Sequence, residues 1–186
     1  WSIITESINS PMNSTNAARS ILTKINFPKE ALVISGIYKL LFNSGIKVLL
    51  LIAFVIIYGI GFNTSALFFP FALFGAVLFG TTIGLFLTPI GMLYKDISKL
   101  IAFGLRFLMY ATPVVYAMPS EGVLRTIMEY NPLTAIILTS RDLLTGTTPE
   151  YLGYFIIVVG CCIPLLFVAL VFYRLSIPII VERLSA

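Results

Sequence analysis

The stretch that decides the fold runs from Leu93 to Tyr116 and reads LYKDISKLIAFGLRFLMYATPVVY. It opens with a polar turn at residues 94–96, directly after a long apolar run without charge. A second apolar segment follows and carries one arginine, Arg106. Two apolar segments joined by a short basic turn are typical of a chain that leaves a membrane and enters it again at the cytoplasmic face. The stretch therefore predicts two membrane-spanning helices with a cytoplasmic turn between them.

The composition agrees with a membrane protein. Of 186 residues, 59% are hydrophobic and 11% are charged, with a mean hydropathy of +1.01, whereas a soluble domain carries about 25% charged residues. The net charge of +4 is spread over loops, so we expect no nucleic-acid partner. The chain has no histidine, and its two cysteines, Cys161 and Cys162, are adjacent within an apolar run. We therefore expect no metal site and no catalytic residues.

The apolar segments predict an all-α, polytopic membrane helix bundle with about four complete spans. At about 1.5 Å per residue, each segment is long enough to cross a hydrocarbon core of about 30 Å. The predicted spans are residues 31–60, 66–93, 98–118 and 151–173.

The segment 119–149 is partly apolar but too short for two further spans. Val123–Tyr130 and Leu133–Leu144 have helical patterns, broken at Asn131-Pro132, and Gly146 ends the second. Two interpretations remain open. The segment is either a pair of short helices that dip back into the outer leaflet, packed on protein or lining a wet cavity, or an ordinary outside loop with amphipathic helices.

The charged residues between the spans predict the orientation. Seven basic residues lie on one side, in segments 16–30, 94–99 and 174–186. Two basic residues lie on the other side, in segments 61–65 and 119–150. Basic residues favour the cytoplasmic side, so we expect the C-terminus to be cytoplasmic and segment 119–149 to lie outside.

The N-terminal thirty residues are unlike the rest. Residues 1–15 are rich in Ser, Asn and Thr, do not begin with methionine and do not read as a signal peptide, so we expect an N-terminal part to be missing. Ala17–Ile25 can form a short helix, which Pro28 interrupts. Phe27 is either an interfacial anchor or a docking element for a cytoplasmic partner.

Polar residues within the spans predict where a passage lies. Ser35, Lys39, Asn43 and Lys47 recur every four residues, so they share one helix face. Lys39 is expected to snorkel to the interface. All eight acidic residues lie outside the predicted spans, so we expect Lys47 and Arg106 to have no acid partner within the membrane in this chain. They should then face water, an anionic substrate, a second subunit or the missing segment.

Two further stripes lie on the middle spans. Gly80 and Gly84 belong to a line of small residues, which favours close helix packing within the subunit or at a dimer seam. Phe103, Phe107 and Tyr110 form an aromatic stripe beside Arg106. These rings either stack on sugars in a wet passage or pack against another helix.

The order of these features resembles the permease subunits of ABC type-2 exporters, in the group that exports O-antigen, capsule or teichoic acid chains. The features are FPKE at 27–30, Tyr58-Gly59, the turn at 94–96, TPVVY at 112–116, Asn131-Pro132 and Arg141. The likeness covers nearly the whole chain from about residue 14, and it rests on order and spacing because each motif is short.

The resemblance implies six membrane helices, of which this chain would lack the first, and residues 1–30 would be the end of a helix plus a coupling helix. It implies a homodimer around a central channel, two nucleotide-binding ABC ATPase subunits that hold ATP and Mg²⁺, a lipid-linked glycan as substrate, and the bacterial inner membrane as location. No cofactor is expected on this chain. The residues implied are, for ATPase coupling, Arg19, Lys24, Phe27, Pro28, Lys29 and Glu30; for the channel, Asn43, Lys47, Phe103, Arg106, Phe107 and Tyr110; and for the periplasmic gate, Asn131, Pro132 and Arg141.

Three functions compete at this point. The first is a permease subunit, not itself an enzyme, that exports a lipid-linked polysaccharide with a partner's ATP, since the chain has no GxxxxGK[ST] motif. The second is an exporter of the same architecture for a drug or a lipid. The third is a membrane-embedded transferase, which would need a carboxylate cluster or a histidine near a membrane face.

Overall fold

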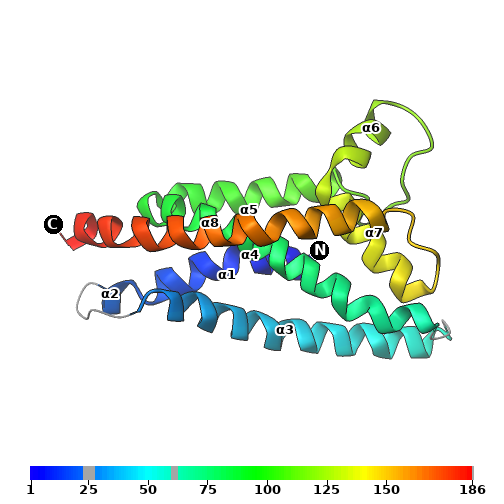
Figure 1. Cartoon of the computed structure of the whole chain (residues 1–186), viewed down its shortest axis with the longest axis horizontal. Coiled ribbons are helices and arrows are strands. Elements are labelled where there is room, and N and C mark those ends of the chain that lie inside the picture. The colour runs from blue at the N-terminus through cyan, green and yellow to red at the C-terminus, as the bar shows by residue number, and fades with distance from the viewer. Residues whose placement is uncertain (23–27, 60–62, 186) are drawn as a thin grey trace.

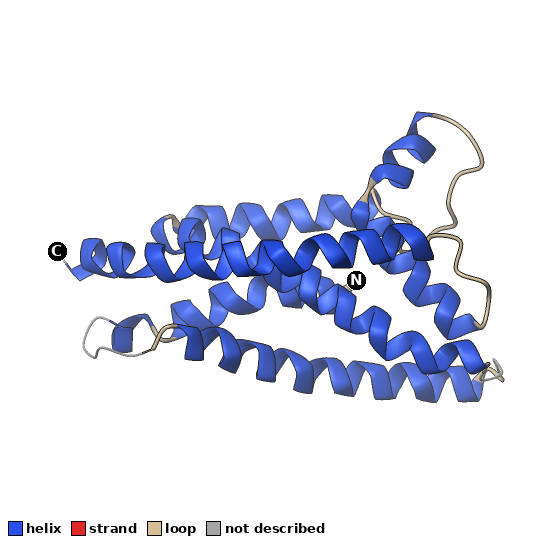
Figure 2. Cartoon of the chain, in the orientation of Figure 1, coloured by secondary structure: helices blue, strands red, loops and turns tan. Residues whose placement is uncertain are grey.

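The structure is a computed structural model, and it describes residues 1–22, 28–59 and 63–185. The all-α prediction is confirmed, because every regular element among the described residues is helical (Figure 2). The elements are α1 (Ser2–Ala17), α2 (Arg19–Leu22), α3 (Glu30–Ile57), the 3₁₀ helix η1 (Thr64–Phe68), α4 (Phe69–Leu93), α5 (Lys95–Tyr110), α6 (Val123–Tyr130), α7 (Pro132–Thr145) and α8 (Leu152–Ser185).

Three helical stretches in the described chain are long and apolar enough to cross a membrane. They are Glu30–Ile57, Thr64–Leu93 and Leu152–Arg183, and they coincide with three of the four predicted spans. The remaining predicted span, residues 98–118, corresponds to α5, which has 16 residues, or a length of about 24 Å. The protein is therefore a multi-pass membrane protein.

The observed α5 differs from the predicted span 98–118 because it ends at Tyr110. Pro113 lacks an amide hydrogen and disfavours helical geometry at the residue before it. The carbonyl oxygens of Pro113 and Val114 instead accept hydrogen bonds from Arg141 of α7, at 2.7 and 3.1 Å. A turn at residues 111–114 therefore replaces the last part of the predicted span.

The N-terminal helix α1 lies in the middle of the bundle, between α3 and α5 in the view of Figure 1, and packs most closely on α4. Its polar side chains are compatible with burial because they bond to carbonyl oxygens of their own helix. The hydroxyl of Ser7 donates to Ile3 at 2.7 Å, and that of Thr15 donates to Pro11 at 2.7 Å. Both residues are fully buried, so the polar stretch 1–15 is a packed helix.

Glycines of α4 allow α1 to approach closely. A Cβ added at Gly84 would lie 2.3 Å from the carbonyl oxygen of Ile8, and one added at Gly80 would lie 2.5 Å from the Cβ of Ser7. Backbone atoms cannot move aside as a flexible side chain can, so this crossing requires glycine at residue 84.

The two ends of the bundle carry different elements. α2, the turn between α4 and α5, and the C-terminal end of α8 lie at one end, which we call the basic end because Arg19, Lys29, Lys99 and Arg183 belong to it (Figure 1). η1, α6 and α7 lie at the opposite end. A core of buried residues from α2, α3, α4 and α8 closes the basic end, and a second core joins α1, α4, α7 and α8.

Candidate functional site

The polar stripe of α3 faces α1, and one ion pair joins the two helices. The Nζ of Lys47 forms a salt bridge with the Oε2 of Glu6 and lies 2.9 Å from the hydroxyl of Ser2. The amide of Asn43 donates to the Oε1 of Glu6 at 2.7 Å. Both oxygens of the Glu6 carboxylate are therefore occupied, and the side chains of Lys47 and Glu6 are 37% and 29% exposed.

The prediction that Lys47 has no acid partner in the membrane was wrong. It failed because Glu6 was assigned to a polar N-terminal stretch, whereas that stretch is a helix packed along α3 and α4. The sequence does contain a pattern that indicates the contact between α1 and α3. Glu6, Ser10 and Ser14 are spaced by four residues, as are the polar residues of α3, so two polar helix faces were available to meet.

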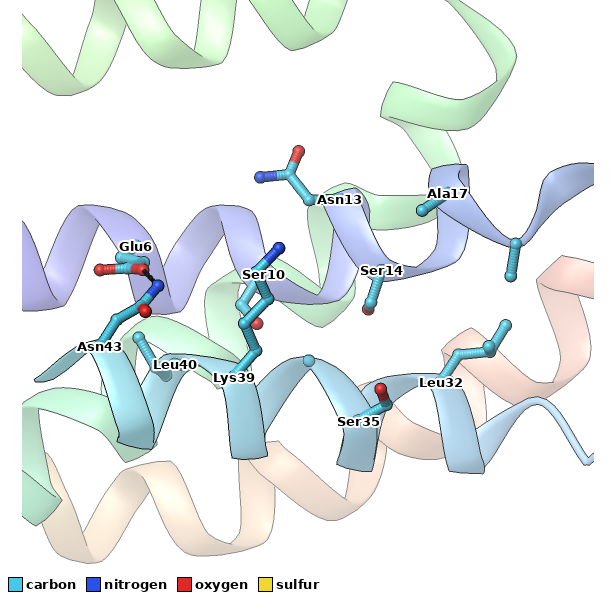
Figure 3. Close-up of a pocket in the computed structure, with 12 residues that line it drawn as sticks. Glu6, Ser10, Asn13, Ser14, Ala17, Leu32, Ser35, Lys39, Leu40 and Asn43 are labelled. Carbon is cyan, nitrogen blue, oxygen red and sulfur yellow. Dashed lines mark hydrogen bonds between the residues drawn. The ribbon is translucent and has the colours of Figure 1, made fainter. Parts of the chain in front are cut away.

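A groove of about 610 Å³ lies between α1 and α3, next to this ion pair (Figure 3). Its lining combines hydroxyl and amide side chains with small and apolar residues, and it includes one further cation, Lys39, which points from α3 toward α1 (Figure 3). The lining residues are Glu6, Ser10, Asn13, Ser14, Ala17, Ala18, Leu32, Ser35, Gly36, Lys39, Leu40 and Asn43. A water-filled or ligand-filled groove is the arrangement that polar groups in a membrane protein favour.

The predicted channel residues of α5 form a separate set. Phe103, Arg106, Phe107 and Tyr110 are all exposed, and the rings of Phe103 and Phe107 lie 4.7 Å apart with an edge-to-face geometry. Arg106 forms no hydrogen bond or salt bridge with any residue that the structure describes. α5 and α3 lie on opposite sides of α1 in Figure 1, so the structure does not bring Lys47 and Arg106 together.

Residues of α7 hold the turn that follows α5. Asn131 caps α7, since its side-chain oxygen accepts from the amide of Leu133 at 3.0 Å, and Pro132 takes the first helical position. The side-chain nitrogen of Asn131 donates to the hydroxyl of Thr112 at 3.1 Å. Together with the Arg141 bonds to the turn, this contact joins three motifs that the sequence singled out separately, namely TPVVY, Asn131-Pro132 and Arg141.

At the end of the bundle that holds α6 and α7, two charged groups have shifted pKa values. The hydrogen bond to Glu129 raises the pKa of Arg125, which lies one helical turn before it on α6. Partial burial raises the pKa of the Asp142 carboxyl, although a hydrogen bond from Thr147 opposes the change. Glu150 acts on both groups, and Glu129 and Tyr151 also act on Arg125. The described residues hold no group of three or more histidine, cysteine or acidic side chains that could bind a metal ion.

The predicted ATPase-coupling residues lie at the basic end, as far as the structure describes them. Lys24 and Phe27 fall outside the described residues. Arg19 begins α2, and Pro28 and Lys29 precede α3, whose first residue, Glu30, lies 3.1 Å from Arg174 of α8 in a salt bridge.

One residue that the sequence did not single out, Tyr173, joins this segment to the bundle. Its side chain is fully buried on α8, and its hydroxyl lies 2.9 Å from the hydroxyl oxygen of Thr15 and 3.4 Å from the carbonyl oxygen of Lys29. Leu22 of α2 belongs to the same core. Tyr173 therefore connects α1, the start of α3 and α8. No local pattern marks this tyrosine, because its partners are 144 and 158 residues away in sequence.

The apolar spans, the polar contact between α1 and α3 and the basic end together define a multi-pass membrane protein with a polar interior groove. Residues 32–145 match the model of the ABC-2 type transporter family. This match covers more than half of the chain, so the protein belongs to the ABC-2 type transporter family, and the predicted resemblance is confirmed.

Two proteins of similar sequence are both O-antigen export system permease protein RfbA of Klebsiella pneumoniae. One is 25% identical over 175 residues, which is 88% of this chain and 67% of that protein. The other is 24% identical over 155 residues, which is 81% of this chain and 59% of that protein. The chain thus spans about two thirds or less of the length of these relatives.

Proposed function

We propose that this chain is the permease subunit of an ABC exporter that moves a lipid-linked polysaccharide across the bacterial inner membrane. The similarity to two O-antigen export permeases over most of the chain carries the proposal. The exposed residues of α5 support it, because Arg106 has no polar partner among the described residues and a hydrophilic cargo needs polar and charged groups along its path. In this proposal the chain works as a homodimer, and its passage is lined by the exposed face of α5.

The energy source in this proposal is a separate nucleotide-binding subunit that docks on the basic end. The segment between α1 and α3 supplies the docking element, and two features support its role. Leu22 of α2 is buried in the core with Tyr173, and Tyr173 contacts the carbonyl oxygen of Lys29. A displacement of the segment by the partner is thereby passed to α1 and α8. In the cell, the basic end faces the cytoplasm, which agrees with the excess of basic residues there.

The orientation is tested with single cysteines in a variant whose native cysteines are replaced by alanine. Asp96→Cys marks the basic end, where the native side chain is 92% exposed, and Thr147→Cys marks the opposite end. A membrane-impermeant maleimide should label Thr147→Cys in intact spheroplasts and Asp96→Cys only after lysis. Labelling of Asp96→Cys in intact spheroplasts would contradict the proposed orientation.

The function is tested in a strain that lacks its own permease gene and carries this one as a full-length gene with its partner ATPase. We expect surface polysaccharide, measured with an antibody or lectin, to depend on both genes and to disappear when the P-loop lysine of the ATPase is replaced. Normal surface polysaccharide without this permease, together with altered export of a drug or a phospholipid, would favour the alternative cargo instead.

Arg106 provides the residue-level test of the passage. It is exposed on α5 and has no polar partner among the described residues, so its replacement should leave the fold intact. We expect Arg106→Gln to reduce export while expression and thermal stability stay unchanged. Arg106→Lys should restore export only in part, because an ammonium group lacks the planar, bidentate fork with which guanidinium binds phosphate oxygens. Normal export by Arg106→Gln would show that Arg106 does not contact the cargo in the passage.

A further inference from the structure

The groove between α1 and α3 holds polar groups that the fold does not use. Ser10 and Asn13 on α1 and Ser35 and Lys39 on α3 line it (Figure 3). None of these four side chains forms a hydrogen bond or a salt bridge with a residue in the described part of the chain. A groove in a membrane protein that gathers free hydroxyl, amide and ammonium groups needs water or a ligand to satisfy them.

The charge balance of the groove decides which ligand fits. The acid that faces Lys39 is Glu6, and its two carboxylate oxygens already accept from Lys47 and Asn43. Lys47, which lies outside the groove lining, pairs with Glu6, so the charge of Lys39 has no salt-bridge partner among the described residues. Hydroxyl and amide groups beside it can donate hydrogen bonds to an oxyanion, and a lysine binds phosphate as a point charge. The groove therefore has room for an oxyanion such as a phosphate beside Lys39.

The position of the groove indicates that this anion belongs to an amphiphile. Lys39 lies nine residues after the start of α3, or about 14 Å along the helix. Tyr38 and Phe42, which precede Lys39 and Asn43, are 70% and 73% exposed on the outer side of α3. An apolar surface on a membrane helix contacts lipid chains. A lipid whose chains lie on Tyr38 and Phe42 would thus carry its head group to Lys39.

We propose that the groove between α1 and α3 binds the phosphate head group of a membrane lipid, with Lys39 as the residue that pairs with the phosphate. This inference needs only a membrane-embedded α3, so it does not depend on which cargo is exported. The phosphate has two possible sources, a bilayer phospholipid or the lipid carrier of the cargo, and both present the same chemistry to Lys39.

The test uses the full transporter complex in nanodiscs of phosphatidylcholine with a minor fraction of phosphatidylglycerol. After extraction in mild detergent, lipids that stay bound are identified by native mass spectrometry. We expect the wild-type complex to retain phosphatidylglycerol and Lys39→Gln to retain about fivefold less, as for the loss of one partly exposed ion pair. Lys39→Arg should retain it, since the charge remains, and Lys99→Gln is the matched control because Lys99 lies on α5, outside the groove.

Three outcomes decide the proposal. Equal retention by the wild type and Lys39→Gln overturns it. Lower retention by Lys39→Gln supports the proposal. If added undecaprenyl phosphate also displaces phosphatidylglycerol from the wild-type complex, the site is assigned to the lipid carrier of the cargo. If Lys39→Gln retains less phosphatidylglycerol but undecaprenyl phosphate does not displace it from the wild type, the proposal is supported and the site is assigned to a bilayer lipid. The assay needs neither ATP nor export. A transporter that exports polysaccharide normally but shows no Lys39-dependent lipid retention would therefore contradict this inference and leave the proposed function intact.

Discussion

The Glu6–Lys47 ion pair makes a quantitative prediction that a double-mutant cycle can test. Exposed ion pairs contribute up to about 1 kcal/mol, and breaking a buried pair costs about 3–5 kcal/mol. Because the two side chains are about one third exposed, we expect a coupling energy of about 2 kcal/mol, between these limits. For a chain of this length each kcal/mol shifts the melting temperature by about 2–4 °C, so the coupling corresponds to about 4–8 °C.

The variants for this cycle are Glu6→Gln, Lys47→Met and the double variant, and the measurement is thermal unfolding of the purified complex in detergent. Each single variant leaves one charge without its partner and should melt at a lower temperature. The double variant removes both charges and should recover most of the loss. The matched control is Arg125 and Glu129 on α6, an exposed pair at 2.8 Å, for which we expect a clearly smaller coupling because water and salt screen a surface ion pair. If the effects of Glu6→Gln and Lys47→Met simply add, α1 and α3 are not joined by this pair.

Three further predictions concern packing and hydrogen bonds. Gly84→Ala should lower the melting temperature and the yield of folded protein, because its Cβ would collide with the backbone of Ile8, whereas Gly160→Ala, with open space around its Cα, should melt as the wild type does. Tyr173→Phe should lower stability by about 1 kcal/mol through the lost hydroxyl contacts, and in a reconstituted complex it should weaken the stimulation of ATP hydrolysis by substrate; unchanged stimulation would show that the Tyr173 contact does not link the ATPase to the bundle. Asn131→Ala should lower stability by about 1 kcal/mol because α7 loses its cap, and it should increase protease cleavage near residue 112. Asn131→Asp keeps the cap but loses the bond to Thr112, so it should keep most of the stability and show only the increased cleavage.

The sequence predicts the apolar helices well, because their limits are local properties. Long, predominantly apolar stretches define α3, α4 and α8, and the proline that follows Asn131 separates α6 from α7. Such signals depend on composition and backbone geometry within one segment. The resemblance to ABC type-2 permeases rests instead on the order and spacing of short motifs along the chain, and the family match over residues 32–145 confirms it.

The sequence was less informative where a side chain is satisfied by a distant partner. α1 is too polar to be recognised as a central helix, because nothing local shows that Ser7 and Thr15 bond to their own helix or that Gly84 leaves room for Ile8. The partner of Lys47 was missed for the same reason. The end of α5 was misplaced because the bonds from Arg141 to the turn join residues that are 27 and 28 positions apart.

The packing of α1 has a consequence for how the protein is made. A helix with Glu6 and a series of serine and asparagine residues is costly to place in lipid alone. Its stable environment consists of Lys47 on α3 and the glycines of α4, and both are synthesised after it. The helix therefore gains these contacts only after residues up to Gly84 have been synthesised. Substitutions at Lys47 or Gly84 would then act on biogenesis as well as on the finished transporter, because α1 would lack the contacts that stabilise it in the bundle.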